Sequence, residues 1–341
     1  MKLEQMPRIR LAHLPTPLEE MKNLSKELGG PRLFIKRDDA TGLAFGGNKA
    51  RKLEFIMADA VAQGADVVIT SGGVQTNHGR MTVAAATKLG LKPVLILTGE
   101  EPEVYQGNLA LSYLMGAEIH FVAADPGLDY EEKMRQLRAR GEEKALEVKK
   151  EYEKQGLKCY IVPRGGRMPQ GTAGYLNGVL ELYQQMIEMN LKVDYIVTAT
   201  GSTSTTGSLI LGNKVFNTGI KTIGISVSRS ANECKDRIME ELEKDIAFYE
   251  YDVQIERDEI VVFDDYIGPG YSLPTEEGIN AIKLLAQKEA IILDYTYSGK
   301  AMAGLIDLIK KGYFSRDDVV VFLHTGGGPG LFALDDKLYR K

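Results

Sequence analysis

The sequence predicts an α/β protein whose sheets are open, twisted and mostly parallel, with helices on their faces. From residue 50 onward, short β-branched runs such as "DVVIT" (66–70) and "PVLIL" (93–97) alternate with amphipathic segments. This β-α-β succession is typical of buried parallel strands joined by right-handed crossovers. Since 341 residues exceed what one hydrophobic core usually holds, we expect two such units.

The first unit is expected from the segments that follow residue 50. "ARKLEFIMADAVAQG" places its apolar residues on one helical face and stops at Gly64. In chain order, we then expect a strand at 66–70, a helix at 80–90, a strand at 93–97, a helix at 108–116 and a strand at 118–122.

The charged segment 126–157 is expected to form a solvated helical excursion without a functional role, because charge-rich faces usually lie in solvent. The alternation then resumes and predicts the second unit. Its expected elements are a strand at 194–200, a strand at 222–227, a helix at 275–288, a strand at 290–294, a helix from Gly299 and a strand that runs into "HTGGG".

The composition excludes several classes of protein. A net charge of −5 and a pI near 5.6 give no reason to expect a nucleic-acid partner. Two cysteines and four scattered histidines lack the spacing of a disulfide framework or a zinc site. No apolar run has the length of a signal peptide or a membrane span, so we expect a cytoplasmic protein without a membrane partner.

Polar loops follow four of the expected strands. They are Ser71–His78, Thr200–Thr206, Asp294–Gly299 and Thr325–Gly328. In open α/β sheets, ligands bind beyond the carboxyl ends of the strands. We therefore expect these loops to form one site.

The loop "TGSTSTTGS" combines glycines, hydroxyl groups and the start of a helix, which suits a phosphate. It has neither the Gly-Lys-Ser/Thr of a P-loop nor the G-x-G-x-x-G fingerprint, and an N-cap with a flexible turn is the simpler interpretation. "SGGVQTNHGR" brings Thr76, Asn77 and His78 to a helix start, where Thr76 or Asn77 could be an N-cap or could contact a carboxylate or a cofactor. "LDYTYSGKAMAG" brings Tyr295 and Tyr297 just past an expected strand.

"FGGNKARKLEF" places Lys49 behind two glycines at a helix start, together with Arg51 and Lys52. A basic first turn is the simple interpretation. With a phosphate cradle and no metal-ligand cluster, the alternative is that Lys49 forms a Schiff base with pyridoxal 5′-phosphate.

Five segments resemble one family. "RDDATGLAFGGNKARKLEF", "SGGVQTNHGR", "TATGSTSTTG", "DYTYSGKAMAGL" and "HTGGGPGL" are similar to the D-cysteine desulfhydrase and 1-aminocyclopropane-1-carboxylate deaminase family, in the same order. The resemblance implies the tryptophan-synthase-β-like fold (fold type II of the pyridoxal-phosphate enzymes) and a homodimer. It also implies a smaller domain at 50–165, with residues 1–49 and 166–341 forming the larger, cofactor-binding domain.

The resemblance also implies roles for individual residues. Lys49 is the Schiff-base lysine and Lys52 lies near the phosphate. Asn77 contacts the cofactor ring oxygen, and Tyr271 and Tyr297 line the substrate pocket, the latter near the ring. The phosphate loop is formed by Thr200, Gly201, Ser202 and Thr203. Thr76, Asn77 and His78 would hold the substrate carboxylate.

Three positions separate the branches of this family. His78, Ser298 and Thr325 stand where deaminases have Gln, Glu and Leu. The resemblance therefore implies a lyase that converts D-cysteine to pyruvate, hydrogen sulfide and ammonia, with Thr325 facing the pyridine nitrogen. Thr76 stands where serine is usual, and L-cysteate sulfo-lyases share the pattern, so sulfite is the alternative leaving group. A nucleotide-binding enzyme and a non-catalytic amino-acid sensor stay open as other classes.

Overall fold

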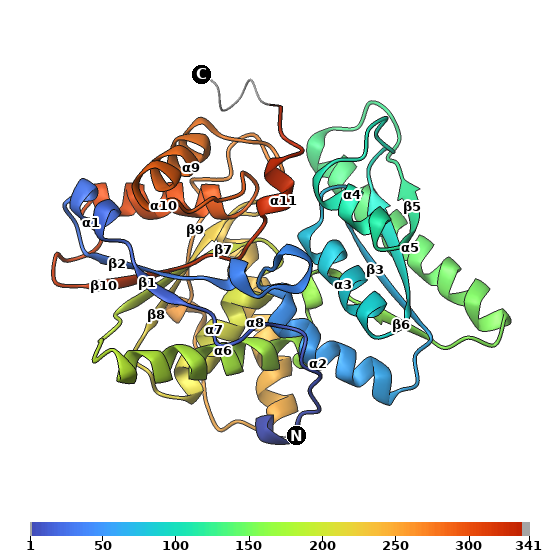
Figure 1. Ribbon diagram of the computed structural model, residues 1–341, viewed down its shortest axis with the longest axis horizontal. Helices are drawn as coiled ribbons and strands as arrows, with labels where there is room; N and C mark the ends of the chain where they lie inside the picture. The colour runs from blue at the N-terminus through green and yellow to red at the C-terminus, as the bar shows by residue number, and fades with distance from the viewer. Residues whose placement is uncertain (1, 336–341) are drawn as a thin grey trace.

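Two separate β-sheets organise the structure, which is a computed structural model that describes residues 2–335 (Figure 1). The larger sheet has the order β1-β2-β10-β7-β8-β9 and the smaller sheet has the order β5-β4-β3-β6. The strands of the larger sheet are β1 (Leu18–Glu20), β2 (Arg32–Lys36), β7 (Tyr195–Thr200), β8 (Lys221–Ser226), β9 (Val261–Phe263) and β10 (Val319–Leu323). Those of the smaller sheet are β3 (Val67–Gly73), β4 (Lys92–Thr98), β5 (Glu118–Val122) and β6 (Cys159–Val162).

All pairings in both sheets are parallel except the one between β1 and β2. Parallel strands bring their carboxyl ends to one edge of a sheet, so the loops after β7 and β10 lie at the same edge of the larger sheet, and the loop after β3 lies at the corresponding edge of the smaller one. The helices are α1 (Lys22–Leu28), α2 (Lys49–Ala62), α3 (Asn77–Lys88), α4 (Gly107–Leu114), α5 (Tyr130–Lys154), α6 (Pro169–Glu188), α7 (Ser204–Val215), α8 (Ala231–Tyr249), α9 (Glu276–Glu289), α10 (Ser298–Lys310) and α11 (Gly328–Leu331).

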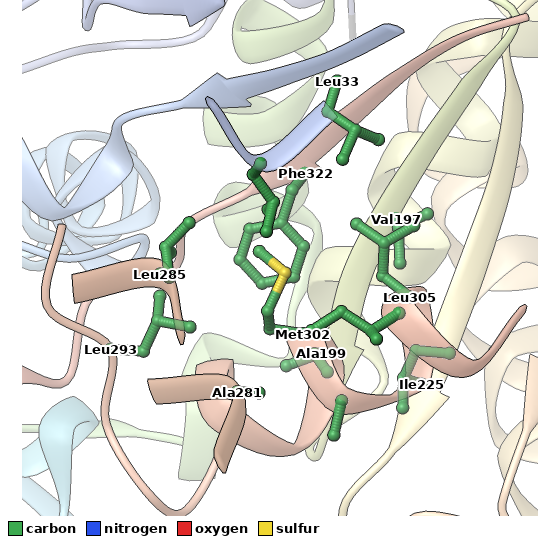
Figure 2. Packing of buried hydrophobic residues seen from close by; sticks show 14 of the residues in the cluster. Leu33, Val197, Ala199, Ile225, Ala281, Leu285, Leu293, Met302, Leu305 and Phe322 are labelled. Atoms are coloured by element: carbon green, nitrogen blue, oxygen red, sulfur yellow. The ribbon is translucent and has the colours of Figure 1, made fainter. Parts of the chain in front are cut away.

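Helices cover both faces of the larger sheet. On one face, Phe322 of β10 packs among side chains of α9 and α10, including Leu285 and Met302 (Figure 2). On the opposite face, alternate strand residues such as Val321 pack against Tyr175 of α6. This alternation is the period of two that a strand imposes on its side chains.

The smaller sheet is covered by α2, α3 and α4 on one face and by α5 on the other. Leu53 and Ile56 of α2 belong to the core of this smaller unit, whereas Phe55 packs against residues of α6 and α8. Helix α2 therefore contributes side chains to the cores of both units.

The expected strand at 290–294 is wrong. Ile291 and Leu293 are buried, but this segment has no strand partner and lies between α9 and α10 (Figure 2). Its alternating apolar residues fill the helical layer of the core instead of a sheet position. The other expected strands are present, whereas β1, β2, β6 and β9 had no counterpart in the sequence prediction.

Residues 2–335 contain no helix of the length and apolar character that crossing a membrane requires.

Candidate active site

A cavity of about 620 Å³ lies where the loops after β3, β7 and β10 meet the start of α2 and the start of α5. The predicted site residues that line it are Lys49, Thr76, Asn77, His78, Gly201, Ser202, Thr203, Tyr271, Tyr297 and Thr325. Lys52 and Thr200 are not part of the lining. The sequence motifs thus converge, although two of the predicted side chains lie behind the wall.

Lys49 is the first residue of α2 and reaches the cavity from a tightly folded glycine turn. Gly46 and Gly47 both have positive φ, and a Cβ on Gly46 would lie 2.0 Å from the carbonyl oxygen of Asp39. These positions require glycine. Burial, and then the charge of Lys52, hold the pKa of Lys49 well below its ordinary value. Lys49 is therefore suited to be an uncharged amine, which is the nucleophilic form.

Lys52 lies one turn further along α2 and is completely buried. Its Nζ donates to Ser204 Oγ at 2.6 Å, and no carboxylate among residues 2–335 forms an ion pair with it. Burial lowers the pKa of Lys52 to about 8, while Glu241 and Asp245 oppose that shift. A buried ammonium group with one neutral partner, at the N-terminus of α7, is the environment that an anion such as phosphate would complete.

The loop before α7 approaches the cavity closely. A Cβ on Gly201 would lie 2.8 Å from the ring of Tyr297, and Thr203 adopts a positive φ of 73°. Thr203 Oγ1 donates to Glu241 Oε2 at 2.9 Å, so its hydroxyl is held away from the cavity. Thr200 is buried and shares a 2.8 Å hydrogen bond with Thr206. The loop therefore offers its backbone and Ser202, more than its threonine hydroxyls, to a ligand.

The start of α3 forms a second polar wall. Thr76 is the N-cap: its Oγ1 accepts from the backbone N–H of Gly79 at 3.1 Å, and its hydroxyl hydrogen is left for another acceptor. The first backbone N–H groups of a helix have no acceptor within it, which here applies to Asn77 and His78. Asn77 Oδ1 accepts from Asn108 at 2.8 Å, which leaves Nδ2 of Asn77 as a donor.

His78 is buried and neutral. The hydroxyl of Thr70 donates to the carbonyl of Val162 at 2.8 Å, so Nε2 of His78 must be the donor in its 2.9 Å contact with Thr70. Nδ1 is then a buried acceptor without a partner among the described residues. Burial, followed by the charge of Lys49, keeps the pKa of His78 well below its ordinary value. The ring can accept a hydrogen bond from a ligand but does not supply a positive charge.

Tyr271 and Tyr297 also line the cavity. The hydroxyls of Tyr271 and Tyr297 are 2.5 Å apart. Asp294 accepts from the backbone N–H of Tyr297 at 2.9 Å, and buried Lys300 donates to the carbonyl oxygens of Ile267 and Gly270. Asp294, which belongs to one of the four predicted loops, and Lys300, which had no predicted role, therefore fix the segments that carry the two tyrosines.

The expectation that 126–157 has no functional role does not match the structure. Tyr130, Arg135 and Arg138 at the start of α5 line the cavity, and the backbone N–H of Tyr271 donates to Tyr130 Oη at 2.7 Å. Arg164, in the turn after β6, also lines it. A clue was present in "PRGGRM", where two glycines follow an arginine directly after a strand.

Comparisons with known proteins agree with this arrangement. The sequence pattern of a family described as "Pyridoxal-phosphate dependent enzyme" matches residues 9–326. A D-cysteine desulfhydrase of Klebsiella pneumoniae (strain 342) is 41% identical over 336 residues, which cover 97% of each chain. A Pyrococcus abyssi protein with the provisional name 1-aminocyclopropane-1-carboxylate deaminase is 41% identical over 98% of this chain and 96% of its own. A crystal structure of an ACC deaminase homologue superposes with a TM-score of 0.87 at 37% identity, covering 99% of this chain and 97% of the other.

Proposed function

Because the chain belongs to the family of pyridoxal-phosphate dependent enzymes, we propose that it is a lyase that eliminates the β-substituent of a 3-substituted alanine. Our first candidate is D-cysteine, which would give pyruvate, hydrogen sulfide and ammonia. The observation that carries this proposal is Lys49, an amine of lowered pKa that faces the same cavity as a helix N-terminus with a buried lysine behind it.

The residues present fit pyridoxal 5′-phosphate. Buried Lys52 and the start of α7 would hold the phosphate, Nδ2 of Asn77 would donate to the ring oxygen, and Thr325 would face the ring nitrogen. When bound, the cofactor supplies an aldehyde carbon for the Lys49 amine and an electron-withdrawing ring that makes the Cα proton of an amino acid acidic.

Lys49 is the base in the proposed reaction. An uncharged Nζ can accept the Cα proton of the substrate, and the lowered pKa of Lys49 increases the fraction of this amine that is uncharged. The Gly46–Gly47 turn fixes where the amine emerges, so proton transfer needs little further ordering.

The remaining walls orient the substrate. The backbone N–H groups at the start of α3 and the hydroxyl of Thr76 would bind the substrate carboxylate, while Nδ1 of His78 would accept a hydrogen bond from a donor of the ligand. The paired hydroxyls of Tyr271 and Tyr297, which line the same cavity, would hold or move a proton at the leaving sulfur.

A second candidate is L-cysteate, which would release sulfite. The observation that favours it is the set of arginines at the start of α5 and after β6, since a sulfonate brings a second negative charge. Ring-opening deamination is disfavoured, because Ser298 stands where the deaminases have Glu, donates to Asp294 Oδ1 at 2.6 Å and is not part of the cavity lining.

The assembly and compartment are part of the proposal. We propose a cytoplasmic homodimer, with residues 50–165 as the smaller domain and 1–49 plus 166–341 as the larger. Leu180, Tyr183 and Ile187 are exposed at helical spacing on α6, which supports a contact with a second copy. Sedimentation analysis of the holoenzyme, with Ile187→Glu as the disrupting variant, tests the dimer.

A pyruvate-release screen tests the reaction. The purified holoenzyme is given D-cysteine, L-cysteine, L-cysteate, 3-chloroalanine and 1-aminocyclopropane-1-carboxylate in turn, and hydrogen sulfide, sulfite and 2-oxobutanoate are measured in parallel. The four-carbon cyclopropane substrate would give 2-oxobutanoate instead of pyruvate. We expect pyruvate with hydrogen sulfide from D-cysteine. A coloured protein that releases neither 2-oxo acid from any of these would be an amino-acid sensor, and a colourless one with a bound nucleotide would contradict the cofactor.

A further inference from the structure

Four arginines that line the cavity form no ion pair with a carboxylate among the described residues. They are Arg135, Arg138, Arg164 and Arg229. Arg229 donates to the carbonyl oxygen of Gly201 at 2.7 Å, so the loop before α7 holds its guanidinium, whereas the other three are left to attract an anion. Arg140, on the same helix as Arg135 and Arg138, pairs with Asp125 at 2.7 Å. In a chain of net charge −5, unpaired guanidinium groups gathered at one cavity indicate that they attract an anion there.

Arg164 is the most constrained of the three. It begins the turn after β6, and the next residue, Gly165, has a positive φ of 77°. A Cβ on Gly165 would lie 2.5 Å from Cβ of Ser202. The arginine backbone is therefore held against the loop before α7, and a bulkier residue at Gly165 would push the two segments apart.

Arg164 lines the same cavity as the tyrosine pair, and its turn packs against Ser202, next to Gly201, which lies against the ring of Tyr297. Burial raises the pKa of Tyr297 well above its ordinary value, Tyr271 raises it further, and the charge of Arg164 pulls it down. Arg164 also acts on His78, whose pKa it lowers after the larger effects of burial, Lys49 and Lys52. The positive charge thus acts on two residues that line the cavity, His78 and Tyr297.

The proposed function assigns the other contacts of a bound amino acid. Its carboxylate is assigned to the start of α3 and its Cα proton to Lys49, which leaves its β-substituent for the tyrosine wall. No residue has yet been assigned to bind the negative charge that develops on this β-substituent. Arg164 is an arginine that lines the same cavity as Tyr271 and Tyr297.

Resting on that function, we propose that Arg164 binds the leaving group of the β-elimination. As the bond between Cβ and sulfur breaks, its electron pair goes to sulfur, the Cα proton goes to Lys49, and Arg164 donates hydrogen bonds to the departing anion. Arg135 and Arg138 extend the positive field toward the entrance. The substrate class is an alanine whose 3-substituent leaves with substantial negative charge on sulfur or on oxygens bound to it.

The test compares leaving groups in one active site. Arg164→Gln, Arg164→Lys and the control Arg140→Gln are assayed as holoenzymes for kcat/KM with D-cysteine and with 3-chloro-D-alanine, whose chloride leaves easily without help. We expect Arg164→Gln to lose about 10- to 100-fold on D-cysteine, the range for a lost hydrogen bond to a charged group, and less than about threefold on the chloro substrate. Arg164→Lys should lie between, and Arg140→Gln should match the parent.

Cofactor absorbance and thermal unfolding confirm that each variant is folded and loaded. Equal losses on both substrates would overturn the proposal, because Arg164 would then bind the carboxylate or support the fold. An unchanged Arg164→Gln enzyme would overturn it as well. If the parent holoenzyme releases no pyruvate from either substrate, the proposed function fails and this proposal falls with it.

Discussion

The first turns of α2 carry two buried cations whose surroundings are opposite. Arg51 donates to Asp38 at 2.8 and 2.9 Å and to Glu181 at 2.7 and 2.9 Å, and Tyr175 donates to Asp38 as well. Lys52, the next residue, has Ser204 as its one hydrogen-bond partner.

This difference separates a structural cation from a functional one. The Arg51 cluster is satisfied within the chain, so a ligand has nothing to add to it. Lys52 has no such counter-charge among the described residues, which supports our proposal that it binds the cofactor phosphate. Burial and charge are the same in both residues, and what distinguishes them is whether the protein supplies the counter-charge.

Lys49→Ala should have the largest effect. Removing the amine removes both the covalent partner of the cofactor and the base, so we expect a loss of at least about 10⁴-fold in pyruvate release. The visible absorbance of the lysine-bound cofactor should vanish while thermal unfolding of the cofactor-free protein stays unchanged. Exposed Lys88→Ala is the matched control, and colour retained in Lys49→Ala would contradict the assignment.

Arg51→Met tests the structural role of Arg51, the cation with acidic partners. It leaves Asp38 and Glu181 buried without their main counter-charge, which costs about 3–5 kcal/mol of unfolding free energy. Urea unfolding of the cofactor-free protein measures it. A variant that unfolds like the parent but binds cofactor weakly would reverse the roles assigned to the two cations.

Lys52→Gln tests the proposed phosphate-binding role of Lys52. We expect cofactor affinity to fall about 10- to 100-fold, since a charge-assisted contact to phosphate is lost. The unfolding free energy of the cofactor-free protein should be unchanged or higher, because a buried ammonium group with a single neutral partner has been removed. Titration with pyridoxal 5′-phosphate and urea unfolding separate these two effects.

The stability of the parent protein at acid pH should depend on the cluster of Arg51, Asp38 and Glu181. Burial would raise the pKa of Glu181, but Arg51 and then Lys36 lower it to about 2. A lowered carboxyl pKa gives stability that is complete above the ordinary value near 4.5 and is lost as the pH falls through about 2. Unfolding free energies of the parent should therefore decline over this window. Glu181→Gln should be less stable at neutral pH and flatter below it.

Thr76→Ser should have the smallest effect. Serine keeps the oxygen that accepts from Gly79 and the hydroxyl hydrogen that is open to a ligand, so kcat/KM should change less than about threefold. Thr76→Val, with a similar volume but no hydroxyl, should lose about 1 kcal/mol of stability together with substrate affinity. If Thr76→Ser shifts the preference between D-cysteine and L-cysteate, the methyl group selects the substrate.

The sequence predicted what depends on local pattern. The turn before Lys49, the cap at Thr76 and most central strands follow from glycines, polar caps and apolar runs that lie within a few residues of one another. The partners of Arg51 lie 13 and 130 residues away in the chain, so no local pattern connects them. For the same reason, Arg51 had no predicted role.

Two other features needed the folded chain. The apolar alternation at 290–294 reports burial, but whether a buried segment pairs as a strand depends on a free neighbour in the sheet. Charge along α5 predicted an exposed helix, and most of its surface is exposed. The N-terminal turns of α5 reach the cavity because its C-terminal turns pack on the smaller sheet, and the sequence of the helix does not show this packing.

Helix α5 also bears on how the substrate specificity of such a protein could change during evolution. Its later turns anchor it through Ala145, Val148 and Tyr152 on the smaller sheet, whereas its first turns carry Arg135 and Arg138 over the cavity. One residue inserted between these parts would rotate the leading arginines by about 100° and leave the anchor in place. The substrate preference of the enzyme could thus change through α5, while the proposed cofactor-binding residues on α2 and α7 stay the same.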